Sequence, residues 1–108
     1  MIRKAFGARP EAIRDSNKIV DHYLTTAGDR IAERFIDALE ATYAGIATEP
    51  QIGSTRYAHE LGVERLRSRR LKHFPYLVFY VELDDRIEVW RVLHAQRDIP
   101  RRIDDGEG

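Results

Sequence analysis

The hydrophobic residues of this chain change their spacing about halfway along the sequence. Up to residue 46 they recur at intervals of three and four, whereas after residue 63 they alternate along the chain. The first spacing is typical of amphipathic helices and the second of strands. The 108 residues have the length of a single domain. We therefore expect one α+β domain over residues 1–108, with a flexible tail at about 104–108.

Two helices are expected in the first half. Pro10 suits a first helical turn, and Gly28 is a left-handed stop that ends the first helix. Asp29 would cap the second helix. Apolar residues recur at helical spacing in both helices. In the first they are Ile13, Val20, Tyr23, Leu24 and Ala27. In the second they are Ala32, Phe35, Ile36, Leu39, Tyr43 and Ile46. This pattern predicts an antiparallel helical hairpin, preceded by a short strand within residues 2–6 that Gly7 ends.

The second half contains three segments with strand alternation, which follow a loop over 57–62: residues 63–73, 76–83 and 86–94. Short connections between them favour antiparallel neighbours. The middle segment is apolar on both faces, which predicts a central strand. In the last segment, strict alternation places Ile87, Val89 and Leu93 on one face, and Trp90 and Val92 on the other. The expected order is therefore β-α-α-β-β-β, an N-terminal strand, a helical hairpin and a three-stranded antiparallel meander.

The charge balance, the cysteine count and the lengths of the apolar runs argue against a protein that binds nucleic acid mainly through phosphates, a disulfide-bonded protein and a membrane-spanning protein. The chain has 18 Lys and Arg against 18 Asp and Glu, a net charge of zero, whereas proteins that bind nucleic acid mainly through phosphates usually carry a basic excess. It has no cysteine and no apolar run near the ~20 residues that span a bilayer. We expect a cytoplasmic protein without disulfides and without membrane contact.

No sequence motif indicates a metal or a cofactor. The four histidines, His22, His59, His73 and His94, lie at no metal-ligand spacing. The serines have no nucleophile-elbow context, and no glycine-rich phosphate loop is present. We expect neither a metal site nor a cofactor.

An arginine-rich segment is the most unusual feature. Residues 63–73 contain four arginines and one lysine against one glutamate. On a strand, Arg65, Arg67 and Arg69 point to one face, where guanidinium groups would bind phosphate or an acidic partner. Charged side chains also protect edge strands from aggregation. The sequence alone does not decide between a binding surface for phosphate or an acidic partner and protection of an edge strand. Tyr80 and Trp90 are candidate aromatic neighbours of the arginines.

Several of these features together resemble the ParE toxins. The helical hairpin, its closure at Pro50 and Gly53, Leu66-Arg67 and the block YLVFYVELDDRIEVWRVLHAQRDI over residues 76–99 occur in the order found in that family. ParE toxins belong to the ParE/RelE superfamily of bacterial type II toxin–antitoxin systems. The resemblance extends over residues 2–103 and implies a RelE/ParE-like fold.

The resemblance implies one of two toxic activities. ParE-type members are associated with inhibition of DNA gyrase without catalysis, and with plasmid stabilisation. RelE-type members are ribosome-dependent mRNA endonucleases, for which Arg67, Arg91 and His94 would be the catalytic candidates. No tyrosine follows His94, since the last is Tyr80, and the net charge is zero. We therefore favour the gyrase-directed branch. A protein that has lost toxicity and serves as an antitoxin-binding regulatory module is the third alternative.

The resemblance also implies partners. A cognate antitoxin, ParD-like or another small acidic DNA-binding protein, would form a hetero-oligomer with the chain and bind operator DNA. We assign antitoxin contact to Arg65, Arg67, Arg69, Tyr80 and Trp90, and gyrase contact to Arg97, Arg101 and Arg102.

Overall fold

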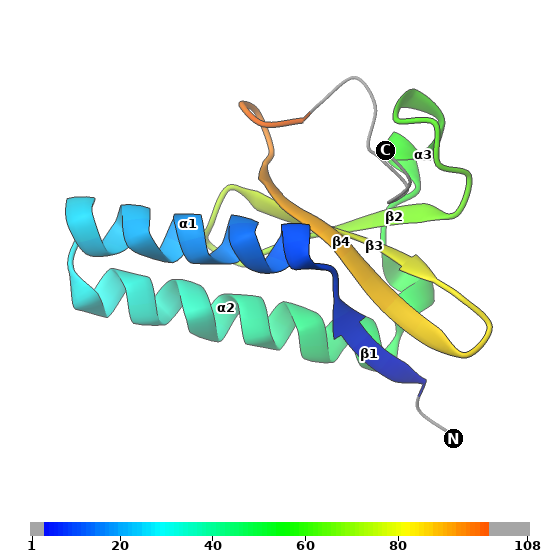
Figure 1. The fold of residues 1–108 in the computed structure, drawn as a ribbon, viewed down its shortest axis with the longest axis horizontal. Helices are drawn as coiled ribbons and strands as arrows, with labels where there is room; N and C mark the ends of the chain where they lie inside the picture. Colours follow the sequence, from blue (N-terminus) through cyan, green and yellow to red (C-terminus); the bar gives the residue numbers. More distant parts are fainter. Residues whose placement is uncertain (1–3, 100–108) are drawn as a thin grey trace.

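A computed structural model of the chain describes residues 4–99, and its elements follow the expected order (Figure 1). The elements are β1 (Ala5–Ala8), α1 (Pro10–Thr26), α2 (Asp29–Thr48), the 3-10 turn η1 (Pro50–Ile52), α3 (Arg56–Glu60), β2 (Leu66–Arg70), β3 (Tyr76–Glu82) and β4 (Arg86–His94). Among these residues no helix is both long enough and apolar enough to cross a bilayer.

The four strands form one mixed sheet in the order β1-β4-β3-β2. β2, β3 and β4 are antiparallel neighbours, which confirms the predicted meander, and β3 lies between two strands as expected. β1 pairs with β4 in parallel. The two edges of the sheet are therefore β1 and β2.

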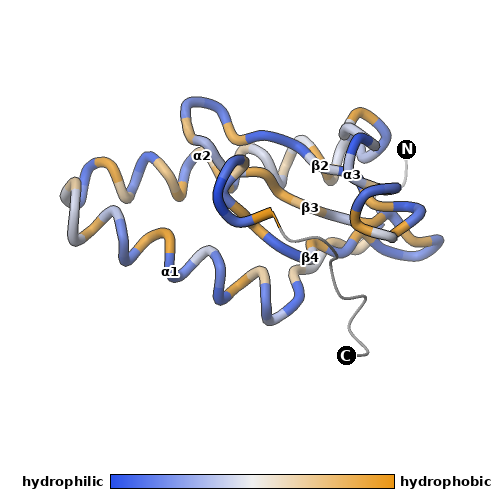
Figure 2. Tube along the Cα trace, turned by 90° about the horizontal axis from the view of Figure 1, so that it is seen from above, coloured by the Kyte–Doolittle hydropathy of each residue, from blue (hydrophilic) through white to orange (hydrophobic). Residues whose placement is uncertain are grey.

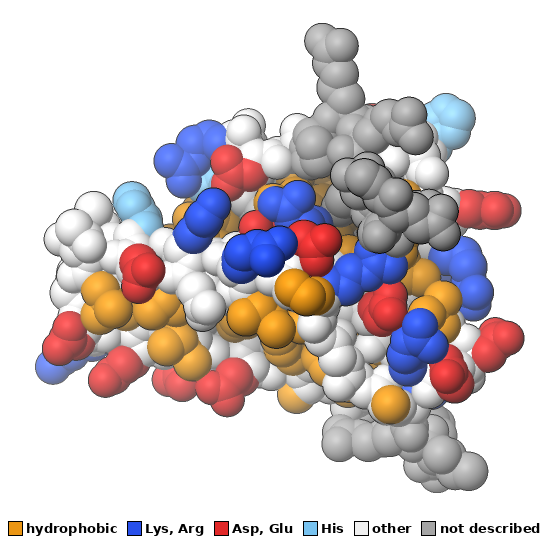
Figure 3. Space-filling view, viewed as in Figure 1, with side chains coloured by type: hydrophobic (Ala, Val, Ile, Leu, Met, Phe, Trp, Pro, Cys, Tyr) orange, Lys and Arg blue, Asp and Glu red, His pale blue; other side chains and the backbone are white. Residues whose placement is uncertain are grey.

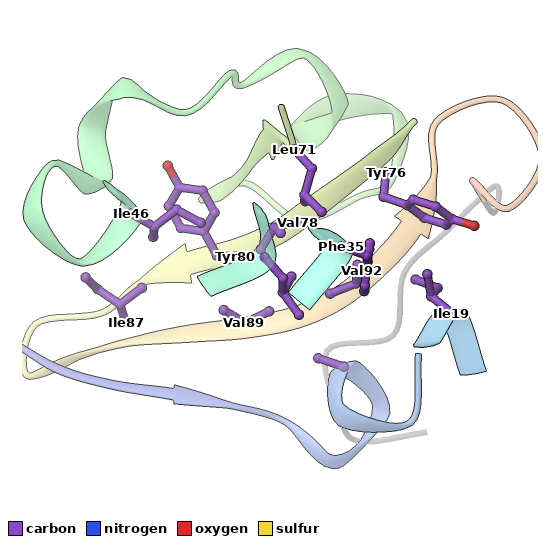
Figure 4. Close-up of a cluster of buried hydrophobic side chains, with 12 residues drawn as sticks. Ile19, Phe35, Ile46, Leu71, Tyr76, Val78, Tyr80, Ile87, Val89 and Val92 are labelled. Atoms are coloured by element: carbon purple, nitrogen blue, oxygen red, sulfur yellow. The ribbon is translucent and has the colours of Figure 1, made fainter. Parts of the chain in front are cut away.

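Each face of the sheet carries its own hydrophobic cluster. α1 and α2 run side by side in opposite directions along one face, as Figure 1 shows. The cluster beneath them joins Phe35 and Ile46 of α2 to Val78, Tyr80 and other residues of the sheet (Figure 4). A second cluster covers the opposite face beneath α3 and joins Leu61 to Leu66, Phe79, Trp90 and Leu93. The apolar character of both sides of β3 follows from these two layers.

Three boundaries differ from the prediction. Gly7 lies within β1 and does not end it, because the strand extends to Ala8. Gly28 has a positive φ of 92°, but its ψ of 173° is not that of a left-handed helical stop; Gly28 is the N-cap of α2, and Asp29 is the first helical residue. The segment 57–62, expected to be a loop, contains most of α3.

A β-bulge in β4 changes which residues face the helices. Phe79 is paired with Arg91 and Tyr80 with Val89, so Trp90 is an extra residue in β4. The bulge shifts the alternation by one residue. Val92 therefore joins the helix-facing cluster, and Leu93 joins Trp90 in the opposite one. The predicted faces of Val92 and Leu93 were wrong for this reason.

The hairpin buries only some of the apolar residues that recur at helical spacing. Ala12 and Ile19 are the buried residues of α1, whereas Ile13 is 50% exposed and Leu24 46% exposed; on α2, Ile36 is 37% exposed. On the face shown in Figure 3, hydrophobic side chains gather over the two helices. Ile13, Leu24 and Ile36 follow the helical spacing of the apolar residues but lie outside the buried stripe.

Candidate functional site

The arginine-rich segment forms β2, an edge strand of the sheet. Arg67 is paired with Tyr80 and Arg69 with Val78, so both arginines lie on the side of the helices. Arg65 precedes the strand, is exposed, and lies 4.0 Å from an Asp84 carboxylate oxygen. The hydrophilic trace of β2 contrasts with the largely hydrophobic β3 in Figure 2.

Arg67 and Tyr80 fasten the turn that follows α2. Nη1 of Arg67 donates to the carbonyl oxygens of Gln51 and Gly53 at 3.1 and 2.8 Å. The Tyr80 hydroxyl donates to the carbonyl of Pro50 at 2.6 Å. Burial raises the pKa of Tyr80, although a hydrogen bond from the Gly53 backbone and the charges of Arg69 and Arg67 oppose this rise. These two side chains therefore hold residues 50–53 against the sheet.

Arg69 lies against the last turn of α2. A Cβ added at Gly45 would be 2.6 Å from Nη1 of Arg69, so the absence of a side chain at Gly45 makes room for the guanidinium. The negative end of the helix dipole is at this end of α2, which favours a cation there.

The two aromatic residues proposed as antitoxin contacts are core residues. Tyr80 is 0% exposed and Trp90 is 7% exposed, and they belong to the clusters on opposite faces of the sheet. The indole Nε1 of Trp90 donates to Glu88 at 3.1 Å, and the Arg9 guanidinium lies 3.8 Å from the ring centroid. The expectation that Tyr80 and Trp90 form a surface beside the arginines was therefore wrong.

Arg91 is held in an ion pair with α1. Its Nε and Nη2 donate to the two carboxylate oxygens of Asp15 at 2.7 and 3.0 Å, and Asp15 also accepts the Val92 backbone N–H at 3.0 Å. The hydrogen bond to Asp15 raises the pKa of Arg91, against a smaller opposing effect of burial. The positive charge of Arg91 is thus already neutralised by Asp15 of the same chain.

His94 organises the turn after β4. Its Nδ1 accepts the backbone N–H groups of Gln96 and Arg97 at 3.1 and 3.3 Å, and the imidazole is 9% exposed. Asp98 accepts the backbone N–H of His94. Arg97 is exposed on this turn. Arg101 and Arg102, the other residues assigned to gyrase contact, lie outside the described residues.

Two of the three candidate nuclease residues, Arg67 and His94, lie apart on the sheet. Arg67 lies opposite Tyr80 and His94 opposite Tyr76, positions about 13 Å apart along β3 at the usual strand rise. Arg67, Arg91 and His94 are each engaged in separate contacts with the chain itself. Within residues 4–99 there is also no group of three His, Cys, Asp or Glu side chains that could bind a metal ion.

One feature that the sequence interpretation missed is a groove between α2 and the end of β2. This α2–β2 groove has a volume of about 960 Å³ and lies between Ile31, Ala41 and Gly45 on α2, and Arg69, Lys72 and Phe74 on the other side. A signal for it exists in the sequence, because small residues recur at helical spacing at positions 38, 41, 42 and 45. Without the tertiary structure, nothing indicates that this stripe faces the arginines of β2.

Comparison with known protein families identifies the family to which the chain belongs. The family described as "ParE toxin of type II toxin-antitoxin system, parDE" matches residues 8–99. The chain belongs to the ParE toxin family. The match begins at the end of β1 and covers the rest of the described fold, so it confirms the resemblance seen in the sequence, and the chain is a ParE-type toxin of a type II toxin–antitoxin system.

A solved structure supports the ParE fold. A chain of the structure described as "Chromosomal ParDE TA system from P. aeruginosa" superposes with a TM-score of 0.74 at 17% identity, over 87% of this chain and 98% of that one. At this identity the likeness concerns the fold. No curated protein matches the chain in sequence.

Proposed function

We propose that this ParE-family toxin inhibits DNA gyrase without catalysis and is neutralised by a cognate antitoxin in a hetero-oligomer. The observation that supports this target over the ribosome is that Arg67, Arg91 and His94 are each engaged in contacts of their own within the chain. Arg67 is bonded to the carbonyls of Gln51 and Gly53, and Arg91 to Asp15. His94 uses Nδ1 within its own turn.

A ribonuclease of this kind would need a different arrangement. It must activate a 2′-hydroxyl with an acid–base group and stabilise the transition-state phosphate with fixed cations, all around one phosphorus atom. A guanidinium already paired with a carboxylate contributes little to such a site. An inhibitor that acts by binding alone needs a complementary surface and no catalytic groups. Arg97 on its exposed turn is our candidate for gyrase contact, together with Arg101 and Arg102.

The antitoxin would contact the basic edge of the sheet at Arg65 and Arg69. Arg67 can add its charge to that surface while it holds the turn after α2. Operator DNA would be bound through the antitoxin, in keeping with the zero net charge of this chain. We place the complex in the bacterial cytoplasm.

The test measures both activities with the same protein. The chain is expressed under tight control, and the purified protein is added to gyrase supercoiling reactions and to a translation system with labelled mRNA. We expect loss of supercoiling and intact mRNA. Codon-dependent cleavage of mRNA with normal supercoiling would refute the proposal, and growth without arrest in cells would favour a regulatory module.

A conservative variant of His94 sharpens this test. In His94→Asn the amide oxygen can still accept the N–H groups that Nδ1 accepts, but it cannot transfer a proton. Loss of a general acid or base lowers rates by about 10²–10⁴-fold. We expect His94→Asn to arrest growth as the native toxin does, as will the control His22→Asn on the exposed side of α1.

A further inference from the structure

The α2–β2 groove has the size of a small-molecule site. Its volume is about 960 Å³, and ligand pockets usually measure about 300–1,000 Å³. The groove is elongated, because it follows α2 from Ile31 to Gly45, a length of about 21 Å at the rise of an α-helix. On the side of α2 the small residues Ala38, Ala41 and Gly45 line it, so a linear ligand has room to lie along the helix.

Basic side chains surround this groove and have no acidic partner. Its lining contains one acid, Asp37, against five basic residues, which are Arg34, Arg69, Arg70, Lys72 and His73. Within residues 4–99 none of the five has a carboxylate oxygen within 4.0 Å, whereas five basic residues elsewhere each have one. The chain as a whole has a net charge of zero. The groove is therefore a local excess of positive charge that suits an anion.

Arg69 is held in place without a partner for its charge. Its Nη1 lies 2.6 Å from the position that a Cβ of Gly45 would take, so the guanidinium fills the space of the missing side chain. Among the described residues Arg69 has no ion pair and no side-chain hydrogen bond. A guanidinium that is positioned and unpaired can bind the oxygens of a phosphate with two hydrogen bonds.

A strained turn borders the groove near the start of α2. His73 has a φ of 68° and is the one residue other than glycine with a positive φ in the part of the chain that the structure describes. Residues in this conformation gather at ligand sites. Within that part, the backbone N–H groups of Lys72, His73 and Phe74 donate no hydrogen bond to the chain. Successive N–H groups in a turn form concave sites for anions.

The basic groups lie toward both ends of the groove. The turn is near the start of α2, because Phe74 packs against Phe35, and Arg34 is in the same part of the helix. Arg69 lies at Gly45, toward the other end. Arg34 and Gly45 are about 16 Å apart along the helix. One phosphate group is too short to contact both ends, whereas a chain of phosphates can.

We propose that the α2–β2 groove binds a linear polyphosphate, either inorganic polyphosphate or the phosphate chain of a nucleoside polyphosphate. Phosphates at one end contact Arg34, Lys72 and the N–H groups of the turn. Phosphates at the other end contact Arg69. This site does not depend on which target the toxin inhibits.

The phosphate chain is the part of the ligand that the groove recognises. The Phe74 ring packs edge-on against Tyr23 and Phe35, and Tyr80 and Trp90 are buried. None of these rings offers the free face on which the bases of a single-stranded nucleic acid stack. We therefore favour a polyphosphate over DNA or RNA, and DNA is included in the test as a competing ligand.

The first test compares anions of different length. Sodium tripolyphosphate, ATP without Mg²⁺ and orthophosphate are titrated into the full-length protein by calorimetry at about 0.15 M salt. We expect both triphosphates to bind, and orthophosphate to bind at least about tenfold more weakly, because it loses charged hydrogen bonds at one end. ATP that binds tighter than tripolyphosphate would assign the site to a nucleotide, and equal affinities would assign it to the phosphate chain alone. If neither triphosphate binds, the proposal is wrong.

The second test places a charge inside and outside the groove. Ala41 and Ala44 are both exposed alanines of α2, but only Ala41 lines the groove. We expect Ala41→Glu to weaken tripolyphosphate binding by at least about tenfold and Ala41→Lys to strengthen it, since the new charge lies among the phosphates. The same changes at Ala44 should alter the affinity by less than about threefold. Circular dichroism shows whether the variants fold. Equal effects at both positions would mean that the anion responds to overall charge, and would refute the groove.

A third comparison tests the positioned guanidinium and the class of ligand. Arg69→Gln should weaken tripolyphosphate binding by at least about tenfold, whereas Arg14→Gln, the same change of charge on the exposed side of α1, should leave it within about threefold. Equal affinities of these two variants would contradict the role of Arg69. A polyglutamate peptide or a single-stranded DNA that binds the native protein more tightly than tripolyphosphate, and loses this affinity in Ala41→Glu, would overturn the proposal.

Discussion

Asp15 of α1 and Arg91 of β4 form a two-point ion pair, with nitrogen–oxygen distances of 2.7 and 3.0 Å. The pair lies where β1 has ended and β4 continues along the edge of the sheet. Asp15 replaces the missing strand there, because its carboxylate also accepts the N–H of Val92. One side chain thus closes the sheet edge and attaches the helical hairpin to it.

Removal of this carboxylate is expected to destabilise the fold. Asp15→Ala leaves the Arg91 guanidinium and the Val92 N–H without their acceptor, at a cost of about 2 kcal/mol in the free energy of unfolding, since Arg91 is 35% exposed and partly hydrated. Asp15→Asn retains an acceptor for Val92 and should lose less. Urea denaturation measures both. The exposed Asp21→Ala on the same helix is the control, and an equal loss there would contradict the assignment.

Arg67 is expected to act on stability as well as on binding. Arg67→Ala removes the donor to the carbonyls of Gln51 and Gly53, and should lower the free energy of unfolding by about 1–2 kcal/mol. Arg65→Ala, at an exposed position before β2, should change it by less than about 0.5 kcal/mol. Thermal denaturation of the two variants side by side makes the comparison. If both variants were equally stable, the hydrogen bonds of Arg67 to the turn at residues 50–53 would not stabilise the fold.

Gly53 is expected to tolerate no side chain. A Cβ at this position would collide with the hydroxyl of Tyr80, whose hydrogen bond to Pro50 fixes the ring. Gly53→Ala should therefore cost about 1–3 kcal/mol of stability through overpacking. Gly7→Ala is the matched control, because a Cβ there has no atom within 4 Å. Urea midpoints that fall equally for both would show that the close approach of Tyr80 is not the cause.

Glu88 is expected to make stability depend on acid pH. Burial alone would raise the pKa of Glu88, but hydrogen bonds from Trp90 and Arg86 and the charge of Arg9 hold it below its ordinary value of 4.5. A carboxylate whose pKa is lowered by folding stabilises the native state above its unfolded pKa, and this contribution is lost as the pH falls through the folded pKa. The advantage of the native protein over Glu88→Gln should thus be full at neutral pH and shrink below pH 4.5. Denaturation of both proteins from about pH 7 to about pH 3 measures this difference; a constant difference would contradict it.

The type and order of the elements could be predicted because both depend on local spacing. The helical interval of the α2 residues and the alternation of Leu77, Phe79 and Val81 are visible without knowledge of any partner. The short helix α3 was missed, since five residues are too few to show a period. The faces of Val92 and Leu93 were predicted wrongly, because a bulge at Trp90 depends on the pairing of β3 with β4 and leaves no mark in the alternation itself.

The site was less predictable than the fold. The sequence indicated a basic segment, but residue type does not say which guanidinium is already bonded. Arg67 and Arg91 are bonded within the chain, whereas Arg70 and Lys72 have no ion pair among residues 4–99. Arg34, assigned from the sequence to the polar side of a helix, lines the same groove as these two cations.

The sequence by itself determined a helical hairpin followed by a meander, and a motif order that indicates a ParE-family toxin. These properties are local, or depend on the order of short segments. Only the tertiary structure decided that Tyr80 and Trp90 are buried, that Arg91 pairs with Asp15, and that a basic groove lies between α2 and β2. Each of these properties depends on contacts between residues far apart in the chain, and such contacts exist only once the hairpin is packed on the sheet.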